Sequence, residues 1–260
     1  MGTLHHEDRG TGAPVVLVHG WSLSSAVFDA EAAVLARAHR VIAPDLRGHG
    51  RSGPGAFSLT DLAHDLAGLV DGLRLERAVL AGWSLGAQVA IAALPLVRTR
   101  VSALVLVAGT PRFTAGEGWP HGLPAQSVEV LAHRVRRDPA RAAVRFFEGM
   151  FAEGELDAEE RRRADAVRAA IPVPDPAAAR AGLAVLAQED LRSSLARLDL
   201  PVLLLHGERD PICPVGASRA MADVIPGARL AIVPGAGHAP FLSRPGVLAD
   251  AILSVGAAGA

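Results

Sequence analysis

The chain of 260 residues contains no lysine, no asparagine and no tyrosine, and it has one cysteine. A single cysteine excludes a framework of internal disulfides and leaves a reducing, cytoplasmic setting as the expected location. Because lysine is missing, every cationic side chain other than histidine is an arginine, which we interpret as mutational bias without functional meaning. Clusters of arginine are therefore weak evidence of function on their own.

Long apolar runs and a strong charge imbalance are missing as well. No apolar run reaches the roughly 18 residues that a membrane span needs, and residues 1–12 have no apolar core of signal-peptide type. The formal net charge of -1 argues against binding to nucleic acid or another polyanion. Half of the residues are apolar, so we expect a globular protein. We expect it to be a monomer with neither membrane nor nucleic-acid partners.

Short apolar runs alternate with helical patterns along most of the chain. The runs are almost continuously apolar, as expected for strands buried on both faces of a parallel sheet. One helical pattern lies at 60–73, and Ser58 opens it with Asp61 in capping-box spacing. The alternation predicts a doubly wound, mostly parallel α/β sheet with strands at 15–18, 41–43, 78–81, 103–107, 202–205 and 230–233.

The alternation stops between about residues 110 and 188, where helical patterns bounded by prolines replace strands. We interpret this stretch as a helical cap that is inserted into the sheet domain after its sixth strand. The expected organisation is a first core part at 1–110, the cap at 111–187, and a second core part at 188–260.

A serine stands between a predicted strand and a predicted helix. Gly82, Trp83, Ser84, Leu85 and Gly86 spell GxSxG directly after the strand at 78–81. In this context the motif is typical of a nucleophile elbow, a sharp turn that holds the serine in strained geometry and exposes its Oγ. The alternative is a plain turn between strand and helix. We expect Ser84 to be a nucleophile.

A serine nucleophile needs a base, and the chain offers ten histidines. His238 lies in the sequence GAGHAPF, in a glycine-rich loop after the last predicted strand. In hydrolases with GxSxG, the nucleophile, the acid and the base follow one another along the chain, and only His238 follows every candidate acid. His49 is the main competitor. His19 is expected to shape the turn after the first strand, and His206 to position the acid loop.

The acid is expected in the loop after the strand at 202–205, where the sequence reads HGERDP. Glu208 and Asp210 could both hold the imidazole in the tautomer that accepts the serine proton. Asp210 is preferred because the GxxDPxxP spacing is typical of this loop, although an aspartate before proline also initiates plain turns. Asp45, after an earlier strand, is expected to stabilise its own loop.

The oxyanion of such a reaction needs two backbone donors. We expect one from Leu85, which follows the nucleophile. The other is expected from the turn after the first apolar strand, where Trp21 follows His19 and Gly20. The side chain of Trp21 is expected to line the pocket, to pack in the core, or both. We expect neither a metal nor a cofactor.

Five motifs stand out along the chain: HGW at 19–21, DLRGHGRS at 45–52, GWSLG at 82–86, GTPRFTAGEGWP at 109–120 and GHAPFLSRP at 237–245. Together they resemble the pimeloyl-[acyl-carrier-protein] methyl ester carboxylesterases of biotin synthesis, a family with the α/β-hydrolase fold. The first three are widespread among α/β-hydrolases, whereas Trp83, the Trp-Pro pair at 119–120 and HAPFLSRP are closer to this family. The resemblance implies hydrolysis of the methyl ester of a pimeloyl chain on acyl carrier protein, with release of methanol.

The same resemblance assigns roles to residues of the cap. Arg141 and Arg145 correspond to arginines that contact the carrier protein. Phe146, Phe147 and Met150 correspond to the region that lines the acyl channel, and Trp83 is grouped with these substrate-binding residues. Phe147 is expected roughly opposite the arginines on its helix, toward the pocket.

The cap residues themselves also suit an acidic carrier protein. Asp138 as N-cap and Pro139 as first residue are expected to open a helix on which Arg141 and Arg145 share one face. A second helix, opened by a capping box at 157–160, carries two further candidates on one face, Arg161 and Arg168. Acidic and basic residues balance across the cap, so ordinary solvated helix faces are an equal alternative.

Two other functions remain open. A carboxylesterase or lipase-like hydrolase of small acyl esters would use the same triad with a different cap. A ligand receptor on this fold would bind its ligand without turnover, but nothing in a receptor requires all three catalytic groups. Haloalkane dehalogenase and epoxide hydrolase chemistry is disfavoured, because those relatives have an aspartate at the position of Ser84.

Overall fold

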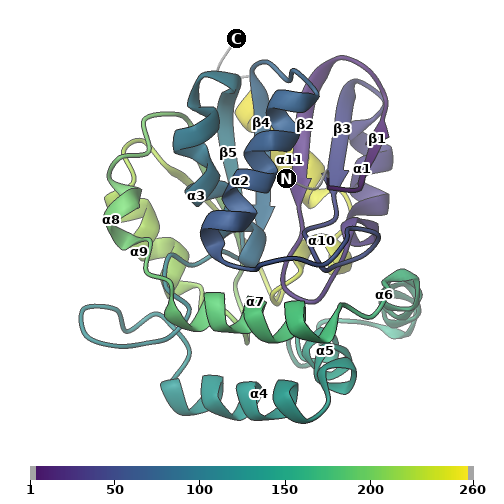
Figure 1. The fold of residues 1–260 in the computed structure, drawn as a ribbon, viewed down its shortest axis with the longest axis vertical. Helices are drawn as coiled ribbons and strands as arrows, with labels where there is room; N and C mark the ends of the chain where they lie inside the picture. The colour runs from purple at the N-terminus through teal and green to yellow at the C-terminus, as the bar shows by residue number, and fades with distance from the viewer. Residues whose placement is uncertain (1–3, 257–260) are drawn as a thin grey trace.

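The computed structural model describes residues 4–256, which form a seven-stranded sheet with helices on both faces (Figure 1). The strand order is β1-β3-β2-β4-β5-β6-β7, and neighbouring strands are parallel except β1 and β3. The strands are β1 His6–Arg9, β2 Ala13–Val18, β3 His39–Pro44, β4 Ala78–Trp83, β5 Val101–Val107, β6 Val202–Gly207 and β7 Arg229–Val233. The doubly wound, mostly parallel sheet expected from the sequence is confirmed.

Each of the six predicted strands lies within an observed one. Strands β2, β4, β5 and β6 are mostly buried, which explains why their sequences are apolar runs with little alternation. The sequence has no signal for β1. Its residues, His-Glu-Asp-Arg, are partly exposed at the edge of the sheet, where backbone pairing with β3 requires no apolar pattern.

Two helix layers enclose the sheet. Helices α2 Leu59–Gly72 and α3 Leu85–Val97 pack together on the face that is in front in Figure 1. Helices α1 Asp29–Leu35 and α11 Val247–Gly256 pack together on the other face, and α9 Gly216–Val224 lies against β6 and β7. The short helices are η1 Ser25–Phe28, η2 Arg98–Arg100 and α10 Pro240–Ser243. None of the described helices has the length and apolar character needed to cross a membrane.

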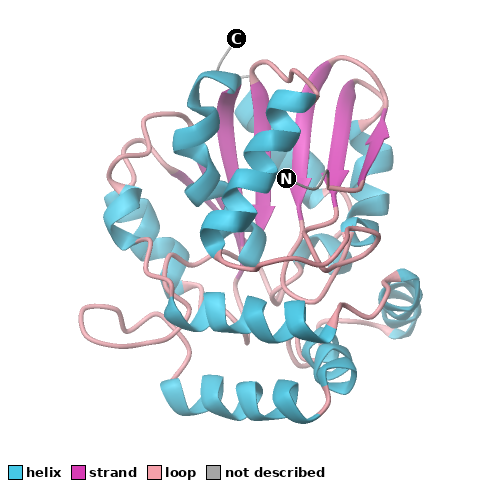
Figure 2. Cartoon of the chain, in the orientation of Figure 1, coloured by secondary structure: helices cyan, strands magenta, loops and turns pink. Residues whose placement is uncertain are grey.

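Between β5 and β6 the chain leaves the sheet and forms a layer of helices beyond the carboxyl ends of the parallel strands (Figure 1, Figure 2). These helices are α4 Ala125–Arg137, α5 Pro139–Glu148, α6 Ala158–Ala170 and α7 Pro176–Gln188, followed by α8 Arg192–Leu195. Helix α4 packs on α5 and α7, whereas α6 contacts α10 and η1. The insertion follows β5, the fifth strand of the described chain, so the expected position after a sixth strand is wrong. We call helices α4 to α7 and the loops that join them the cap. The division of the chain into domains with a cap at 111–187 remains a proposal.

Capping residues set the starts of the helices as the sequence predicts. The side chain of Ser58 accepts a hydrogen bond from the N–H of Asp61, and Asp61 accepts one from the N–H of Ser58. Asp138 accepts from the N–H of Arg141 at 3.0 Å, with Pro139 as the first residue of α5. A second capping box, formed by residues 157 and 160, opens α6.

Candidate active site

Ser84 lies in the turn between β4 and α3, with φ 56° and ψ -117°, a backbone conformation that a serine rarely adopts. The two glycines of the motif allow this turn. A Cβ on Gly86 would lie 2.1 Å from the carbonyl oxygen of Val18, and a Cβ on Gly82 would lie 2.3 Å from the carbonyl oxygen of Gly86. The GxSxG sequence therefore forms a strained strand-to-helix turn, and not a plain one.

The turn after β2 lies against Ser84. Strands β2 and β4 are neighbours, and a Cβ on Gly20 would lie 3.2 Å from the Cβ of Ser84. Trp21 follows Gly20 in this turn. Leu85 is the first residue of α3, where a backbone N–H has no partner within the helix. The two predicted oxyanion donors thus belong to segments that meet beside Ser84.

The loops after β6 and β7 bring Asp210 and His238 together. Nδ1 of His238 lies 2.8 Å from Oδ2 of Asp210, and both side chains are buried. Because a carboxylate can only accept, Nδ1 carries the hydrogen, so in the neutral form of the ring Nε2 is an acceptor. This Nε2 is buried and has no hydrogen-bond partner among residues 4–256.

The carboxylate of Asp210 has partners on both oxygens. Oδ1 accepts hydrogen bonds from the N–H groups of Ile212 and Cys213 at 2.8 and 2.9 Å. Oδ2 lies 3.1 Å from Nε2 of His206. Burial acts to raise the pKa of Asp210, but the charge of His238 and hydrogen bonds from both histidines outweigh it and lower the pKa to about 2. Asp210 is therefore ionised at neutral pH.

His206 has fixed partners of its own. Its Nε2 donates to the carbonyl oxygen of Cys213 at 2.7 Å, and its Nδ1 lies 2.7 Å from Oγ of Ser218. These contacts tie the end of β6 to the loop that carries Asp210, as the sequence predicts. Glu208, the alternative acid, instead accepts a hydrogen bond from the N–H of Gly235 at 2.9 Å.

The competing histidine is buried in the loop after β3. His49 donates from Nδ1 to the carbonyl oxygen of Arg47 at 3.0 Å, and its Nε2 accepts from the N–H of Ser22 at 3.2 Å. Burial, and secondarily the nearby His19, lower the pKa of His49 to about 3, so the ring stays neutral. Asp45 accepts backbone hydrogen bonds at 2.8 and 2.9 Å in the same region. Both side chains have structural partners.

Aromatic side chains from the sheet and the cap meet next to His238. The ring of Trp83 lies 5.7 Å from that of His238, and its Nε1 donates to the His238 carbonyl oxygen at 2.8 Å. Phe146 of α5 stands edge-on to Trp21 with ring centroids 4.9 Å apart, and lies 6.3 Å from the His238 ring. Trp21 donates from Nε1 to the carbonyl oxygen of Ala179 in α7 at 2.8 Å, which fixes its ring beneath the cap.

Phe147 and Met150 are also buried, but they make different contacts. The ring of Phe147 pairs with that of Phe151 at 5.8 Å. The aromatic contact with Trp21 is made by Phe146. Phe147, which the sequence predicts to lie opposite the arginines, is buried as well, and its orientation toward the pocket remains a prediction. The carbonyl oxygen of Met150 accepts a hydrogen bond from the N–H of His238 at 2.7 Å.

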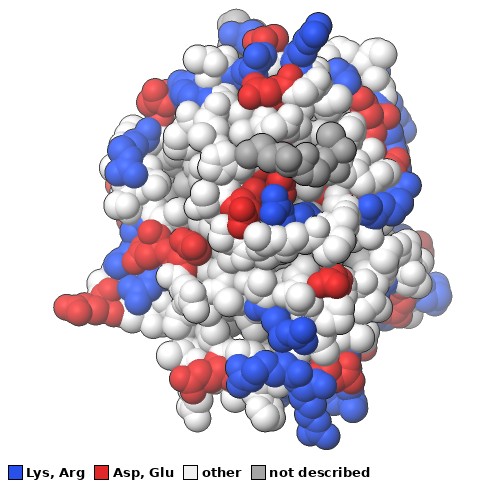
Figure 3. Space-filling model, viewed as in Figure 1, with Lys and Arg blue, Asp and Glu red and all other residues white. Residues whose placement is uncertain are grey.

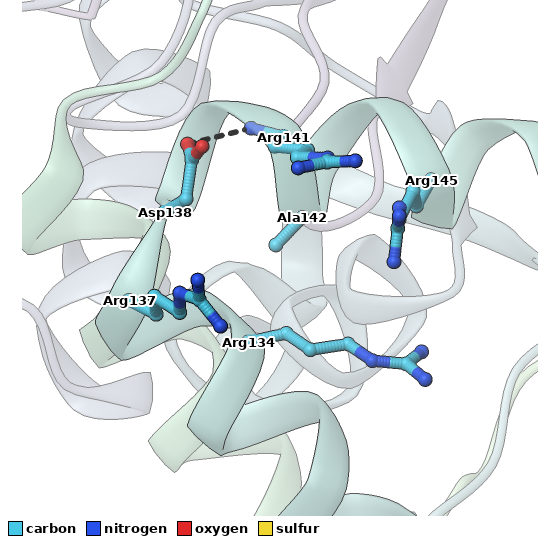
Figure 4. A pocket seen from close by; sticks show the side chains of 6 residues that line it. All are labelled: Arg134, Arg137, Asp138, Arg141, Ala142 and Arg145. Atoms are coloured by element: carbon cyan, nitrogen blue, oxygen red, sulfur yellow. Dashed lines mark hydrogen bonds between the residues drawn. The ribbon is translucent and has the colours of Figure 1, made fainter.

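Four arginines surround a hollow of about 340 Å³ on the surface of the cap (Figure 4). Arg141 and Arg145 come from α5, and Arg134 and Arg137 from α4. Within the described part of the chain, none of the four forms an ion pair, and Asp138 is the one carboxylate that lines the hollow. Figure 3 shows basic side chains gathered at the lower edge of the molecule, where α4 and α5 lie.

Arg161 and Arg168 lie on α6 and do not line this hollow. The guanidinium of Arg161 lies 5.4 Å from the ring centroid of Phe151. Arg168 donates to the carbonyl oxygen of Ile171 at 3.3 Å. The structure therefore divides the four predicted carrier-binding arginines between the hollow and a separate helix.

Metal-binding side chains do not gather in the described residues, where no group of three or more His, Cys, Asp or Glu has the arrangement of a metal site. Cys213 is a buried free thiol. Burial, together with the charge of Asp210, raises the pKa of this thiol well above its usual value. The thiol is therefore protonated and is a poor nucleophile.

One residue near the site has no signal in the sequence. Glu155 lies in the loop between α5 and α6, where a carboxylate shortly before a helix start ordinarily faces solvent. It is buried, and its Oε2 accepts hydrogen bonds from the N–H groups of Ala152 at 2.6 Å and Gly237 at 2.9 Å. Gly237 directly precedes His238, so Glu155 connects the cap with the histidine loop.

Known proteins resemble this chain over nearly its whole length. The profile of the alpha/beta hydrolase family matches residues 15–251. The pimeloyl-[acyl-carrier protein] methyl ester esterase of Nitrosomonas europaea is 37% identical, covering 94% of this chain and 96% of that protein. An esterase structure from Exiguobacterium antarcticum has a TM-score of 0.89 at 27% identity, covering 99% of this chain and 100% of that one. A malate-bound thermophilic esterase from Thermogutta terrifontis has a TM-score of 0.83 at 32% identity, covering 96% and 92%. The chain belongs to the alpha/beta hydrolase family and, within it, to the pimeloyl-[acyl-carrier protein] methyl ester esterases, as the resemblance predicts.

Proposed function

We propose that this chain is a serine esterase in which Ser84 is the nucleophile, His238 the general base and Asp210 the residue that orients the base. The contact between Asp210 and His238 carries the proposal, because it leaves Nε2 of His238 buried, unpaired and able to take a proton. As Oγ of Ser84 attacks the carbonyl carbon of the ester, Nε2 takes the Oγ proton. The N–H groups of Leu85 and Trp21 bind the oxyanion that forms.

The tetrahedral intermediate then collapses. The bond between the carbonyl carbon and the alkoxy oxygen breaks, the proton on Nε2 passes to the leaving oxygen, and a methyl ester releases methanol. Water, deprotonated by the same Nε2, attacks the acyl-serine, and the carboxylic acid leaves with regeneration of Ser84. Asp210, with its pKa lowered to about 2, stays ionised and stabilises the imidazolium in both halves of the cycle.

The proposed substrate is the methyl ester at the far end of a pimeloyl chain attached to acyl carrier protein. The Nitrosomonas europaea relative supports this substrate, since its name states it and the identity of 37% spans nearly both chains. The rings of Trp83 and Phe146 lie 5.7 and 6.3 Å from that of His238, and Trp21 packs against Phe146. We propose that these apolar side chains contact the methylene chain, together with Phe147 and Met150.

Arg141 and Arg145 are the residues that we propose for docking the carrier protein. Acyl carrier proteins are acidic, and the hollow between α4 and α5 gathers four guanidinium groups around a single carboxylate (Figure 4). Like charges without internal partners favour an acidic ligand. Arg134 and Arg137 line the same hollow and extend the surface. Arg161 and Arg168 join it only if the carrier also reaches α6.

A general short-chain carboxylesterase is the second candidate. The solved esterases from Exiguobacterium antarcticum and Thermogutta terrifontis support it, with TM-scores of 0.89 and 0.83. Both candidates use the same triad and differ in whether the cap recognises a carrier. In either case we propose a cytoplasmic monomer that needs neither metal nor cofactor; the single, free cysteine fits a reducing compartment.

Rescue of a biotin-requiring strain that lacks the methyl esterase step tests the proposal. The wild-type gene is expected to restore growth without biotin, and Ser84→Ala, expressed at the same level, is expected not to. Failure of the wild type to rescue, despite good activity on small esters, would favour the second candidate. Rescue by Ser84→Ala would contradict the proposed nucleophile.

A further inference from the structure

The cap binds two successive amides of the histidine loop. The N–H of His238 donates to the carbonyl oxygen of Met150 at 2.7 Å, and the N–H of Gly237 donates to Oε2 of Glu155 at 2.9 Å. Both acceptors belong to residues 150–155, the segment between α5 and α6, which we call the clasp. The helix that carries Arg141 and Arg145 ends at Glu148 and leads directly into it.

The approach between the clasp and the loop is too close for any side chain at Gly237. A Cβ there would lie 2.3 Å from the carbonyl oxygen of Met150 and 2.7 Å from Oε2 of Glu155. Glu155 is 6% exposed, and its Oε2 also accepts from the N–H of Ala152 at 2.6 Å, which closes the clasp on itself. One carboxylate oxygen therefore organises the clasp and holds the loop.

The second oxygen of Glu155 makes the arrangement costly. Oε1 is buried and has no hydrogen-bond partner among residues 4–256. An unpaired buried oxygen destabilises the fold, and a neutral apolar side chain would avoid that cost. Among residues 4–256, Gly237 is the residue outside the clasp with which the side chain of Glu155 forms a hydrogen bond. The effect that offsets this cost is therefore the hydrogen bond that the carboxylate accepts from the histidine loop.

The other contacts of His238 involve its ring and its carbonyl oxygen, whereas its backbone N–H is bound by the clasp. Asp210 holds the ring at Nδ1, and Nε1 of Trp83 donates to the carbonyl oxygen. We propose that Glu155 is a positioning residue, an inference that rests on the proposed function. Through Gly237 it fixes the loop that carries the base, so that Nε2 of His238 is aligned for proton transfer only while the clasp of the cap is in place.

Three substitutions test this proposal. Glu155→Ala removes the acceptor, and Glu155→Gln retains a side-chain oxygen for Gly237. Asp157→Ala is the matched control, because it removes the N-cap of α6 two residues away and leaves the bond to Gly237 intact. The measurements are kcat and KM on a small soluble ester, and the rate at which a fluorophosphonate labels Ser84.

For Glu155→Ala we expect kcat and the labelling rate to fall together, by roughly tenfold to a hundredfold, because a small misplacement of a catalytic group has that effect. KM is expected to stay within about twofold of wild type, since ground-state binding is not altered. Glu155→Gln is expected to recover most of kcat, and Asp157→Ala to behave as wild type. A wild-type kcat in folded Glu155→Ala would overturn the proposal, as would an equal loss in Asp157→Ala.

Hydrogen exchange of the wild-type protein tests whether the clasp and the histidine loop open together, even if Glu155→Ala does not fold. The amides of Gly237, His238 and Ala152 are expected to show similar protection factors, that is, similar slowing relative to the unfolded chain, because they are released together when the clasp opens. Much weaker protection at Gly237 and His238 than at Ala152 would overturn the proposal. Active Glu155→Ala beside inactive Ser84→Ala removes only this inference, whereas active Ser84→Ala removes the proposed function.

Discussion

Nε2 of His206 lies 3.1 Å from Oδ2 of Asp210, the oxygen that also faces His238. A second buried histidine therefore contacts the same carboxylate oxygen as the proposed base. Its other nitrogen lies 2.7 Å from Oγ of Ser218, so the ring cannot turn away from Asp210 without losing that contact too. The proposed acid is fixed by a side chain as well as by the backbone of its own loop.

Replacing His206 with Leu is expected to lower both stability and turnover. The substitution leaves the buried carbonyl oxygen of Cys213 and the hydroxyl of Ser218 without their partner, at a cost of about 1–3 kcal/mol in the free energy of unfolding. Urea unfolding measures the stability, and kcat on a soluble ester measures the effect on Asp210. His64→Leu, on the exposed face of α2, serves as the control. Unchanged values for His206→Leu would refute this role.

The choice between Asp210 and Glu208 as the acid predicts two different outcomes. Asp210→Asn keeps the shape of the side chain but favours the wrong tautomer of His238, so kcat is expected to fall by about 10⁴-fold. Glu208→Gln alters a side chain that contacts Gly235 and is expected to leave kcat unchanged. Steady-state kinetics on one ester compares the two. A larger loss for Glu208→Gln would reverse the assignment.

Because His49 is buried, we expect the free energy of unfolding to depend on pH. Its pKa is about 3 in the folded state and 6.5 when unperturbed, so between these values the unfolded chain binds a proton that the folded chain does not. The free energy of unfolding therefore falls as the pH falls below 6.5, by up to about 1.4 kcal/mol per pH unit from this residue.

Urea titrations of wild type and His49→Gln at several pH values from about 5 to about 7, on both sides of the ordinary histidine pKa, measure this contribution. The wild type is expected to show the steeper slope. His49→Gln can still accept from the N–H of Ser22 while it carries no ionisable ring. Equal slopes for the two proteins would show that His49 protonates in the folded state.

Charge reversal in the arginine hollow predicts a loss that depends on the carrier. Arg141→Glu and Arg145→Glu are expected to raise KM for carrier-linked ester by about tenfold at low salt, and less at raised salt, because the interaction is electrostatic. Activity on small free esters is expected to stay the same. Arg136→Glu, on α4 but outside the lining of the hollow, is the matched control. Equal losses on both kinds of substrate would argue against docking at this site.

We expect Gly86, in the turn that holds Ser84, and Gly68, inside α2, to respond in opposite ways to substitution by alanine. A Cβ on Gly86 would lie 2.1 Å from the carbonyl oxygen of Val18, so Gly86→Ala is expected to lose at least about 1–3 kcal/mol of stability. A Cβ on Gly68, inside α2, would have no neighbour within 4 Å, and Gly68→Ala is expected to gain about 0.5–1 kcal/mol. Thermal unfolding compares both with wild type. Tolerance of Gly86→Ala would contradict the tight turn.

Features that depend on local sequence could be predicted. The inner strands are buried on both faces, so their sequences are apolar runs. Helices α2, α5 and α6 begin at capping residues that can be recognised in the sequence. Gly82 and Gly86 flank a serine because the backbone there tolerates no side chain. Chain order was enough to select His238, which the structure places beside Asp210.

Features that depend on packing between distant segments could not be predicted. Strand β1 is polar because it lies at an edge, and the sequence gives no reason to place Glu155 against Gly237, 82 residues away. The contact of Phe146 with Trp21 joins α5 to the turn after β2, which is far away in the sequence, so periodicity within the helix could not predict it. The separation of the four cap arginines likewise follows from how the cap helices pack.

Hydrolysis of pimeloyl-acyl carrier protein methyl ester by the purified enzyme tests the central claim most directly, with methanol and free carboxylate measured against substrate consumed. The proposed triad and cap predict one methanol per substrate, a kcat/KM well above that for the corresponding free ester, and loss of nearly all turnover in Ser84→Ala. Turnover of small esters with none of the carrier-linked ester, or undiminished turnover in Ser84→Ala, would contradict it.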